Sequence, residues 1–93
     1  MNYRLVFTPS FTRRAARFIA AHPDILNQYG KVLRLLEHDP FHPALRLHKL
    51  KGRLKDLHAV SINIRYRMTL LLQITEKEII PVDLGSHDEV YRS

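Results

Sequence analysis

The apolar residues in the first half of the chain recur every three to four positions, which predicts two amphipathic helices. The first stripe runs from Phe11 to Ile19, directly after the helix-start residues Thr8-Pro9-Ser10. Pro23 separates the two stripes, and Asp39-Pro40 ends the second. A tight link between two helices predicts a helical hairpin. The second stripe consists of Leu26, Tyr29, Val32, Leu33 and Leu36.

The second half of the chain has the alternating pattern of half-buried strands. We expect strands over residues 57–65, 66–74 and 80–84, and a further short strand over residues 3–7 before the helices. Pro81 lacks a backbone N–H, so it should lie at a sheet edge or a bulge. The order is β-α-α-β-β-β, an α+β fold in which the helical hairpin covers one face of an antiparallel sheet. The inward positions expected are Tyr3, Leu5, Phe7, Val60, Ile62, Ile64, Tyr66, Met68, Leu70, Leu72, Ile74, Ile80, Val82 and Leu84.

The length of 93 residues predicts one domain spanning residues 1–93. The chain has no cysteine, which excludes disulfides and thiolate chemistry and is typical of a reducing cytoplasm. It has no apolar run of the ~18–20 residues that a membrane span needs, and no signal-peptide pattern at its start. These features favour a cytoplasmic protein without a membrane partner.

The charge is strongly positive, with 15 Lys and Arg against 9 Asp and Glu and a pI near 10.1. A small basic domain attracts polyanions, although charge can also serve solubility alone. Clustering favours polyanion binding, because a third of the basic residues lie within ten positions. They are Arg46, Lys49, Lys51, Arg53 and Lys55, with His48 and His58 beside them.

Two short segments contain residues that suit acid-base chemistry. His48 stands in the basic segment His48-Lys49-Leu50-Lys51-Gly52, where it suits a general base, although the segment alone reads equally as a solvated loop. Gly85-Ser86-His87-Asp88 follows a predicted strand, and Asp88 either pairs with His87 or caps a turn. Tyr91 either stacks on a base or packs on the core.

Arg65 and Arg67 flank Tyr66 at the start of a predicted strand, so alternation places both arginines on the face that the helices leave uncovered. There they are either solvated or clamp a phosphate. No metal site is expected. His38 and His42 have helical spacing, but Pro40 breaks the helix between them.

The element order and several segments resemble the RelE/ParE superfamily of toxins, most closely its RelE/StbE and YafQ-like branch. The resemblance covers nearly the whole chain, and the ending is its most specific part. It is carried by His48-Lys49-Leu50-Lys51-Gly52, Leu57-His58-Ala59-Val60-Ser61-Ile62-Asn63, Arg67, and Asp83-Leu84-Gly85-Ser86-His87-Asp88-Glu89-Val90-Tyr91.

The resemblance implies the toxin of a type II toxin–antitoxin pair, which cleaves mRNA on the 70S ribosome without metal or small-molecule cofactor. In such toxins the ribose 2′-OH attacks the adjacent phosphate and the 5′-oxygen leaves. The implied catalytic residues are His48, His87 and Arg67, and which histidine is the base stays open. The cognate antitoxin is the implied protein partner. The implied RNA-binding residues are Lys49, Lys51, Arg53, Lys55, Arg65 and Tyr91, with Tyr66 as a weaker stacking candidate.

The chain also departs from the YafQ-like pattern. Ser61 and Arg65 stand where those toxins have a further His and an Asp, so the site would have two histidines. The ParE branch poisons DNA gyrase and generally lacks the histidine set, which makes a non-catalytic gyrase inhibitor one alternative. An inactive homologue that retains its antitoxin-binding surface is another.

Overall fold

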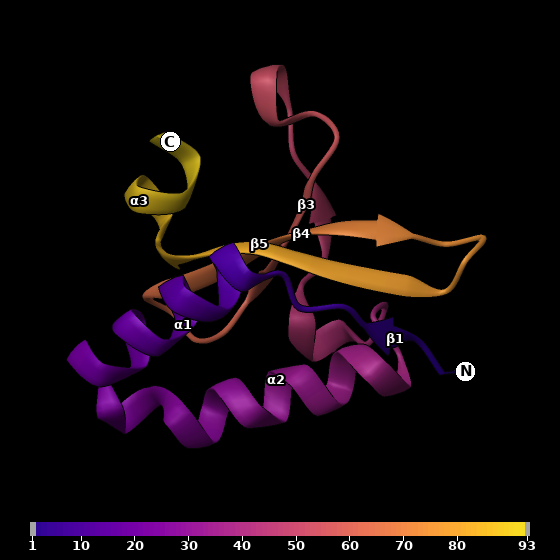
Figure 1. Ribbon diagram of the computed structural model, residues 1–93. Coiled ribbons are helices and arrows are strands. Elements are labelled where there is room, and N and C mark those ends of the chain that lie inside the picture. The colour runs from indigo at the N-terminus through magenta and orange to yellow at the C-terminus, as the bar shows by residue number, and fades with distance from the viewer. Residues whose placement is uncertain (1, 93) are drawn as a thin grey trace.

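The computed structural model describes residues 2–92 and has a five-stranded sheet with helices on both of its faces (Figure 1). The sheet order is β1-β5-β4-β3-β2. Short 3₁₀ turns lie at Pro23–Ile25, Pro43–Leu45 and Gly52–Leu54. The strands and helices are β1 (Arg4–Leu5), α1 (Pro9–Ala21), α2 (Leu26–His38), β2 (His48–Lys49), β3 (His58–Ser61), β4 (Tyr66–Gln73), β5 (Glu78–Ser86) and α3 (His87–Arg92).

The α+β fold with a helical hairpin and an antiparallel β3-β4-β5 meander is confirmed. Thr8 caps α1, because its hydroxyl accepts a hydrogen bond from the backbone N–H of Phe11 at 3.1 Å. The predicted strand over residues 3–7 shrinks to β1, which pairs in parallel with β5, so the sheet is mixed. No helix among residues 2–92 is long and apolar enough to cross a membrane.

The core lies between the α1–α2 pair and the sheet. Val32 and Leu36 of α2 face Val60, Met68 and other inward residues of the strands, and all of these are almost fully buried. Figure 1 shows α1 and α2 together on this side, which we call the hairpin face of the sheet. The predicted burial was wrong for three residues at the ends of the apolar stripes and strands, since Leu26, Ile64 and Ile74 are more than half exposed.

The strand β5 changes phase in its middle. Thr69 pairs with Asp83 but Leu70 pairs with Pro81, so Val82 is an extra residue that bulges out of the ladder. Before the bulge the odd position Ile79 is buried, at 0% exposed, and after it the even position Leu84 is buried, at 7% exposed. The inward placement expected of Leu84 is therefore confirmed, whereas Ile80 and Val82 are only half-buried. The placement of Pro81 at a bulge is also confirmed.

Two elements were not predicted. The strand β2 adds His48 and Lys49 to the sheet edge beside β3. The helix α3 packs on β4 and β5 from the side opposite the hairpin, so the second face of the sheet is not open as expected (Figure 1). Val90 of α3 is only 2% exposed and lies outside the main core cluster. We call this second side the α3 face.

Candidate functional site

His48 and Arg67 lie on the same face of the sheet. In an antiparallel ladder directly paired residues share a face, and along a strand every second residue does. His48 pairs with Ala59, and Arg67 pairs with Ser61, two residues further along the same strand. Val60, between them, points into the core on the hairpin face. His48 and Arg67 therefore point to the α3 face, which for Arg67 is the face that strand alternation predicted.

The helix α3 brings the second histidine to this face. The hydroxyl of Tyr91 lies 3.3 Å from Nε2 of His48, and the ring of Tyr91 meets the ring of His87 edge-on, with 4.2 Å between centroids. Tyr91 thus joins two histidines that stand 39 positions apart in the sequence. We call His48, Tyr91 and His87 the histidine–tyrosine cluster.

The tautomer of His48 follows from its two hydrogen bonds. Its Nδ1 lies 3.0 Å from the backbone carbonyl of Arg46, and a carbonyl oxygen only accepts, so Nδ1 carries the proton. In the neutral ring Nε2 then has a lone pair, which accepts from the hydroxyl of Tyr91. Burial raises the pKa of Tyr91, while the charge of Arg67 lowers it, so the phenol keeps its proton at neutral pH.

Arg67 is held rigidly beside the cluster. Its Nη1 donates to the carbonyl oxygens of Asn63, Ile64 and Tyr66 at 2.7 to 3.2 Å, which fixes the guanidinium against the β3–β4 turn. Arg67 pairs with Ser61 of β3 and with Gly85 of β5, directly before α3, and its charge lowers the pKa of Tyr91. A fixed positive charge of this kind suits stabilisation of a phosphate without rearrangement.

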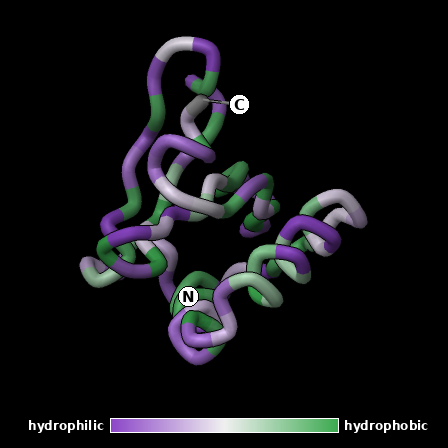
Figure 2. The backbone as a smooth tube through the Cα atoms, turned by 90° about the vertical axis from the view of Figure 1, so that its left-hand side faces the viewer, coloured by the Kyte–Doolittle hydropathy of each residue, from purple (hydrophilic) through white to green (hydrophobic). Residues whose placement is uncertain are grey.

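The basic loop, residues 46–55, does not direct all of its cationic side chains toward the cluster. Arg53 donates a 3.2 Å hydrogen bond to the carbonyl of Tyr91, which ties the loop to α3, and Figure 2 shows this hydrophilic loop beside the C-terminal end of the chain. Lys51 and Lys55 are exposed on the same loop. Lys49 pairs with His58 and so points to the opposite face from His48. Burial, followed by the charges of Lys49 and His48, lowers the pKa of His58.

Alternation predicted that Arg65 and Arg67 share a face, but in the structure they do not. It lies in the turn before β4, where its guanidinium stands 5.6 Å from the ring centre of Tyr66. Tyr66 packs on the hairpin face, with its hydroxyl 3.2 Å from Nδ1 of His22 and its ring edge-on to Phe18. Arg65 and Tyr66 are therefore outside the cluster, and the burial expected of Tyr66 is confirmed in part.

Gly85, Ser86 and Glu89 build the start of α3. The hydroxyl of Ser86 accepts from the backbone N–H of Glu89, and the carboxylate of Glu89 accepts from the backbone N–H of Ser86 at 2.8 Å. This is a capping box, and its Ser-x-x-Glu spacing was a sequence signal that would have located the helix. A Cβ at Gly85 would stand 3.0 Å from Glu89 Oε1. Ser86, rather than Asp88, is thus the cap.

The acidic partner of His87 is loosely placed. The carboxylate of Asp88 lies 3.7 Å from Nδ1 of His87, too long for a hydrogen bond but close enough for an ion pair when the ring is protonated. Both side chains are largely exposed, at 68% and 83%. Asp88 therefore accompanies His87 without fixing its orientation.

Acid should loosen α3 through its capping box. The two hydrogen bonds from Ser86 hold the pKa of Glu89 below its ordinary value of 4.5. A carboxyl with a depressed pKa contributes stability above its unfolded pKa, and this contribution is lost as the pH falls through the folded value. Below pH 4.5 we expect the NMR chemical shifts of the Tyr91 ring to move toward those of a mobile, unpacked tyrosine. The Glu89→Gln variant should lack this transition, and an identical transition in both proteins would contradict the prediction.

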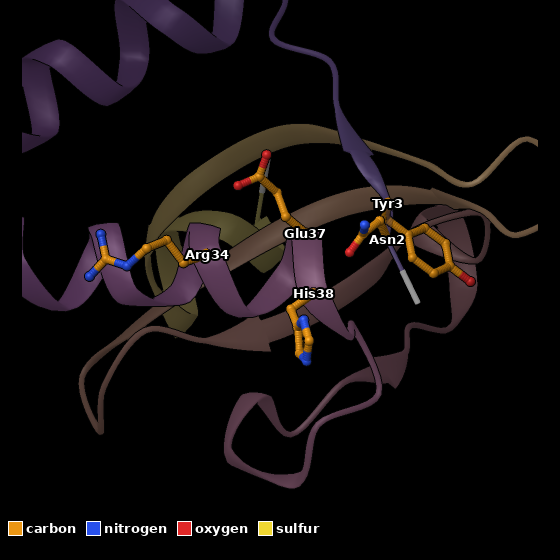
Figure 3. Close-up of a pocket in the computed structure, with 5 residues that line it drawn as sticks. All are labelled: Asn2, Tyr3, Arg34, Glu37 and His38. Atoms are coloured by element: carbon orange, nitrogen blue, oxygen red, sulfur yellow. The ribbon is translucent and has the colours of Figure 1, made fainter.

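A surface pocket of about 440 Å³ lies away from the cluster, on the hairpin side between α2 and the segment before β1. Its polar side chains diverge, with Glu37 and His38 pointing to opposite sides of α2 (Figure 3). Across residues 2–92 no three His, Asp or Glu side chains are grouped as metal ligands. The α3 face is therefore where polar groups of complementary chemistry converge.

No protein-family model and no curated protein matches the sequence, but solved structures match the fold. YafQ from E. coli superposes with a TM-score of 0.78 at 12% identity, over 96% of this chain and 98% of that one. A conserved hypothetical protein from Helicobacter pylori superposes with a TM-score of 0.71 at 26% identity, over 97% of this chain and 99% of that one. A YoeB/ParE toxin from Agrobacterium tumefaciens superposes with a TM-score of 0.71 at 16% identity, over 90% of this chain and 98% of that one. YafQ in its toxin–antitoxin complex with DinJ superposes with a TM-score of 0.76 at 12% identity, over 98% of this chain and 99% of that one. The fold of this chain is therefore the one that YafQ, the Helicobacter pylori protein and the YoeB/ParE toxin share.

Proposed function

We propose that this protein is the toxin of a type II toxin–antitoxin pair and a ribosome-dependent endoribonuclease that acts in the cytoplasm. The observation that carries the proposal is the histidine–tyrosine cluster, in which Tyr91 brings His48 and His87 together beside the fixed guanidinium of Arg67. Cleavage of RNA through its own 2′-OH needs a base, an acid and a positive charge for the phosphorane-like transition state. The cluster and Arg67 supply one candidate for each role.

His48 is the proposed general base. Its Nδ1–H is engaged by the Arg46 carbonyl, so Nε2 takes the proton of the 2′-OH once the substrate displaces the hydroxyl of Tyr91. The 2′-oxygen forms a bond to phosphorus, and the bond from phosphorus to the 5′-oxygen breaks. The products are a 2′,3′-cyclic phosphate and a free 5′-OH.

His87 is the proposed general acid. In its protonated form it gives a proton to the leaving 5′-oxygen, and the carboxylate of Asp88 lies 3.7 Å from its Nδ1. Proton uptake by His48 balances proton release by His87, so the reaction needs no metal or cofactor. Arg67 neutralises the phosphate during the transfer, and the exposed Lys51 and Lys55 guide the RNA to the site.

The protein partner in this proposal is a cognate antitoxin. Support comes from the similarity to YafQ, whose structure is also known in complex with DinJ. The charge of +6 favours an antitoxin with acidic stretches that cover the basic loop and the cluster. Binding there would block RNA access directly.

Inducible expression tests the proposal. We expect the wild-type protein to arrest growth and to produce new 5′ ends within translated messages, mapped by sequencing. His87→Ala should abolish both effects, while His38→Ala, which alters an exposed histidine outside the cluster, should not. Equal arrest by wild type and His87→Ala, or arrest without cleavage, would refute the proposal. Arrest accompanied by loss of gyrase supercoiling would instead support the ParE-like alternative.

A further inference from the structure

Arg53 connects the basic loop to α3, and the proposed mechanism gives it no role. Its Nη2 donates a hydrogen bond of 3.2 Å to the backbone carbonyl of Tyr91. The sequence resemblance implied that Arg53 contacts RNA, but in the structure its guanidinium has a partner within the protein. Figure 1 shows the loop and α3 on the side of the sheet away from α1 and α2. The bond therefore joins two segments of this side that stand 38 positions apart in the sequence.

The backbone of the basic loop is itself hydrogen-bonded around Arg53. The N–H of Leu50 donates to the carbonyl of Leu57 at 3.0 Å and closes the base of the loop. The N–H of Lys55 donates to the carbonyl of Gly52 at 3.1 Å and forms a 3₁₀ turn. Gly52 is in the left-handed region at φ 66°, which glycine adopts without steric cost. These bonds fix the backbone that carries Arg53 before any RNA arrives.

The C-terminal end of α3 depends on a partner from outside the helix. A helix leaves its last four carbonyl groups without partners inside it, and in a helix of 6 residues these are most of its carbonyls. The start of α3 is held by the capping box of Ser86 and Glu89, and its middle by the buried Val90. The carbonyl of Tyr91, near its end, is held by Arg53. Arg53 is thus a C-terminal cap that a distant segment supplies.

Tyr91 is held at two points by the segment 48–53. Its hydroxyl lies 3.3 Å from Nε2 of His48, and its backbone carbonyl accepts from Arg53. In the proposed reaction the RNA displaces the hydroxyl from His48, so the first contact is lost when the substrate binds. The contact with Arg53 involves the backbone and does not compete with the substrate. Of these two links, the one from Arg53 therefore remains in the substrate complex.

This link matters because the proposed general acid stands on the same helix. The ring of His87 meets the ring of Tyr91 edge-on, with 4.2 Å between centroids. His87 is itself largely exposed, and Asp88 is too distant for a hydrogen bond that would orient it. The position of His87 is therefore set by the position of α3. A general acid must lie within hydrogen-bond reach of the oxygen that it protonates, so a displaced helix end would slow proton transfer.

We propose that Arg53 is a positioning residue, which holds the end of α3 once the substrate has displaced Tyr91 and so keeps His87 at the leaving oxygen. The inference rests on the proposed function for its reaction, whereas the hold on α3 is a property of the protein alone. Arg53 thereby differs from Lys55 of the same loop, whose exposed charge attracts RNA.

NMR relaxation of the RNA-free protein tests the hold on α3 without catalysis. Tyr91→Phe removes the hydroxyl and so reproduces the loss of the His48 contact, and Arg53→Ala removes the other link. The backbone order parameters of residues 87–91 should stay at about 0.85 in each single variant and fall below about 0.6 in the double variant. Tyr91→Phe combined with Lys55→Ala, which removes the same charge, should stay rigid. A rigid α3 in the Tyr91→Phe/Arg53→Ala protein would overturn the inference.

Cleavage kinetics on programmed ribosomes separate positioning from attraction of the RNA. Arg53→Ala should lower kcat roughly 2- to 12-fold, the effect of one hydrogen bond, and leave KM nearly unchanged. Lys55→Ala should raise KM and leave kcat nearly unchanged. A raised KM with a normal kcat for Arg53→Ala would show that Arg53 serves RNA binding alone and would reject the positioning role.

The two measurements also separate this inference from the proposed function. If α3 loosens in the Tyr91→Phe/Arg53→Ala protein but the wild type cleaves no RNA, Arg53 holds the helix and the proposed function fails. If the wild type cleaves RNA but α3 stays rigid in that protein, the proposed function stands and Arg53 has no positioning role.

Discussion

Replacing His48 by alanine should lower the rate of RNA cleavage by roughly 100- to 10,000-fold, the range typical of a lost general base. The reason is geometric. The Arg46 carbonyl fixes the proton on Nδ1, so Nε2 is the basic atom presented to the α3 face. The measurement is single-turnover cleavage of a message on programmed ribosomes. His48 is exposed on an edge strand, so the loss should occur without a change in melting temperature.

Two controls separate a base from a structural role. His42→Ala removes another exposed histidine of the same irregular region, one that accepts a hydrogen bond from Ala44 N–H, and it should cleave normally. Imidazole added to the His48→Ala protein should restore part of the rate, because the missing base is small and the site is open to solvent. Cleavage by His48→Ala within about threefold of the wild type would exclude His48 as the base.

The largest stability effect is expected from Leu36→Ala. Leu36 is fully buried where α2 meets the sheet, and truncation of a buried leucine costs about 2–5 kcal/mol through lost burial and the cavity left behind. In a domain of this size each kcal/mol corresponds to about 4–8 °C in melting temperature. Circular dichroism should therefore show a marked fall in Tm, and denaturant unfolding a lower midpoint.

Leu26→Ala is the matched control, since Leu26 begins the same helix and is 55% exposed. Its stability should stay within about 0.5 kcal/mol of the wild type. Leu36 is remote from the α3 face, so the folded fraction of Leu36→Ala should cleave RNA at the normal rate. A similar fall in Tm for both variants would show that the α1–α2 hairpin is not anchored as described.

The periodic parts of the fold were predictable from the sequence. The stripes of α1 and α2 and the alternation of β4 extend over many residues, so one error does not hide the pattern. The helix α3 has 6 residues, and among residues 87–91 Val90 is the one buried side chain, which leaves no stripe to detect. The strand β2 has two exposed residues, and its pairing is visible only in the register with β3.

The candidate residues of the site could be chosen from the sequence, but not the contacts between them. Alternation put Arg67 on the face away from the hairpin, and the basic segment and the ending supplied the two candidate histidines, whereas the position of His48 depends on β2, which was not predicted. Tyr91 as the link between the histidines depends on α3, which was not predicted. Arg65 was placed wrongly because the turn extends to Arg65 itself, so the alternating pattern begins one residue later, at Tyr66.

The bulge in β5 also bears on how copies of this protein behave at high concentration. The ladder with β1 ends at Ile79, so the outer edge of β5 beyond it carries no strand partner. An unpaired strand edge is a template for aggregation. Here an approaching chain would meet Pro81, which has no N–H to offer, then the bulge at Val82, then the ion pair of Asp83 with Arg14 of α1. The bulge that interrupts the apolar alternation of β5 therefore also prevents a strand of another molecule from pairing with its free edge.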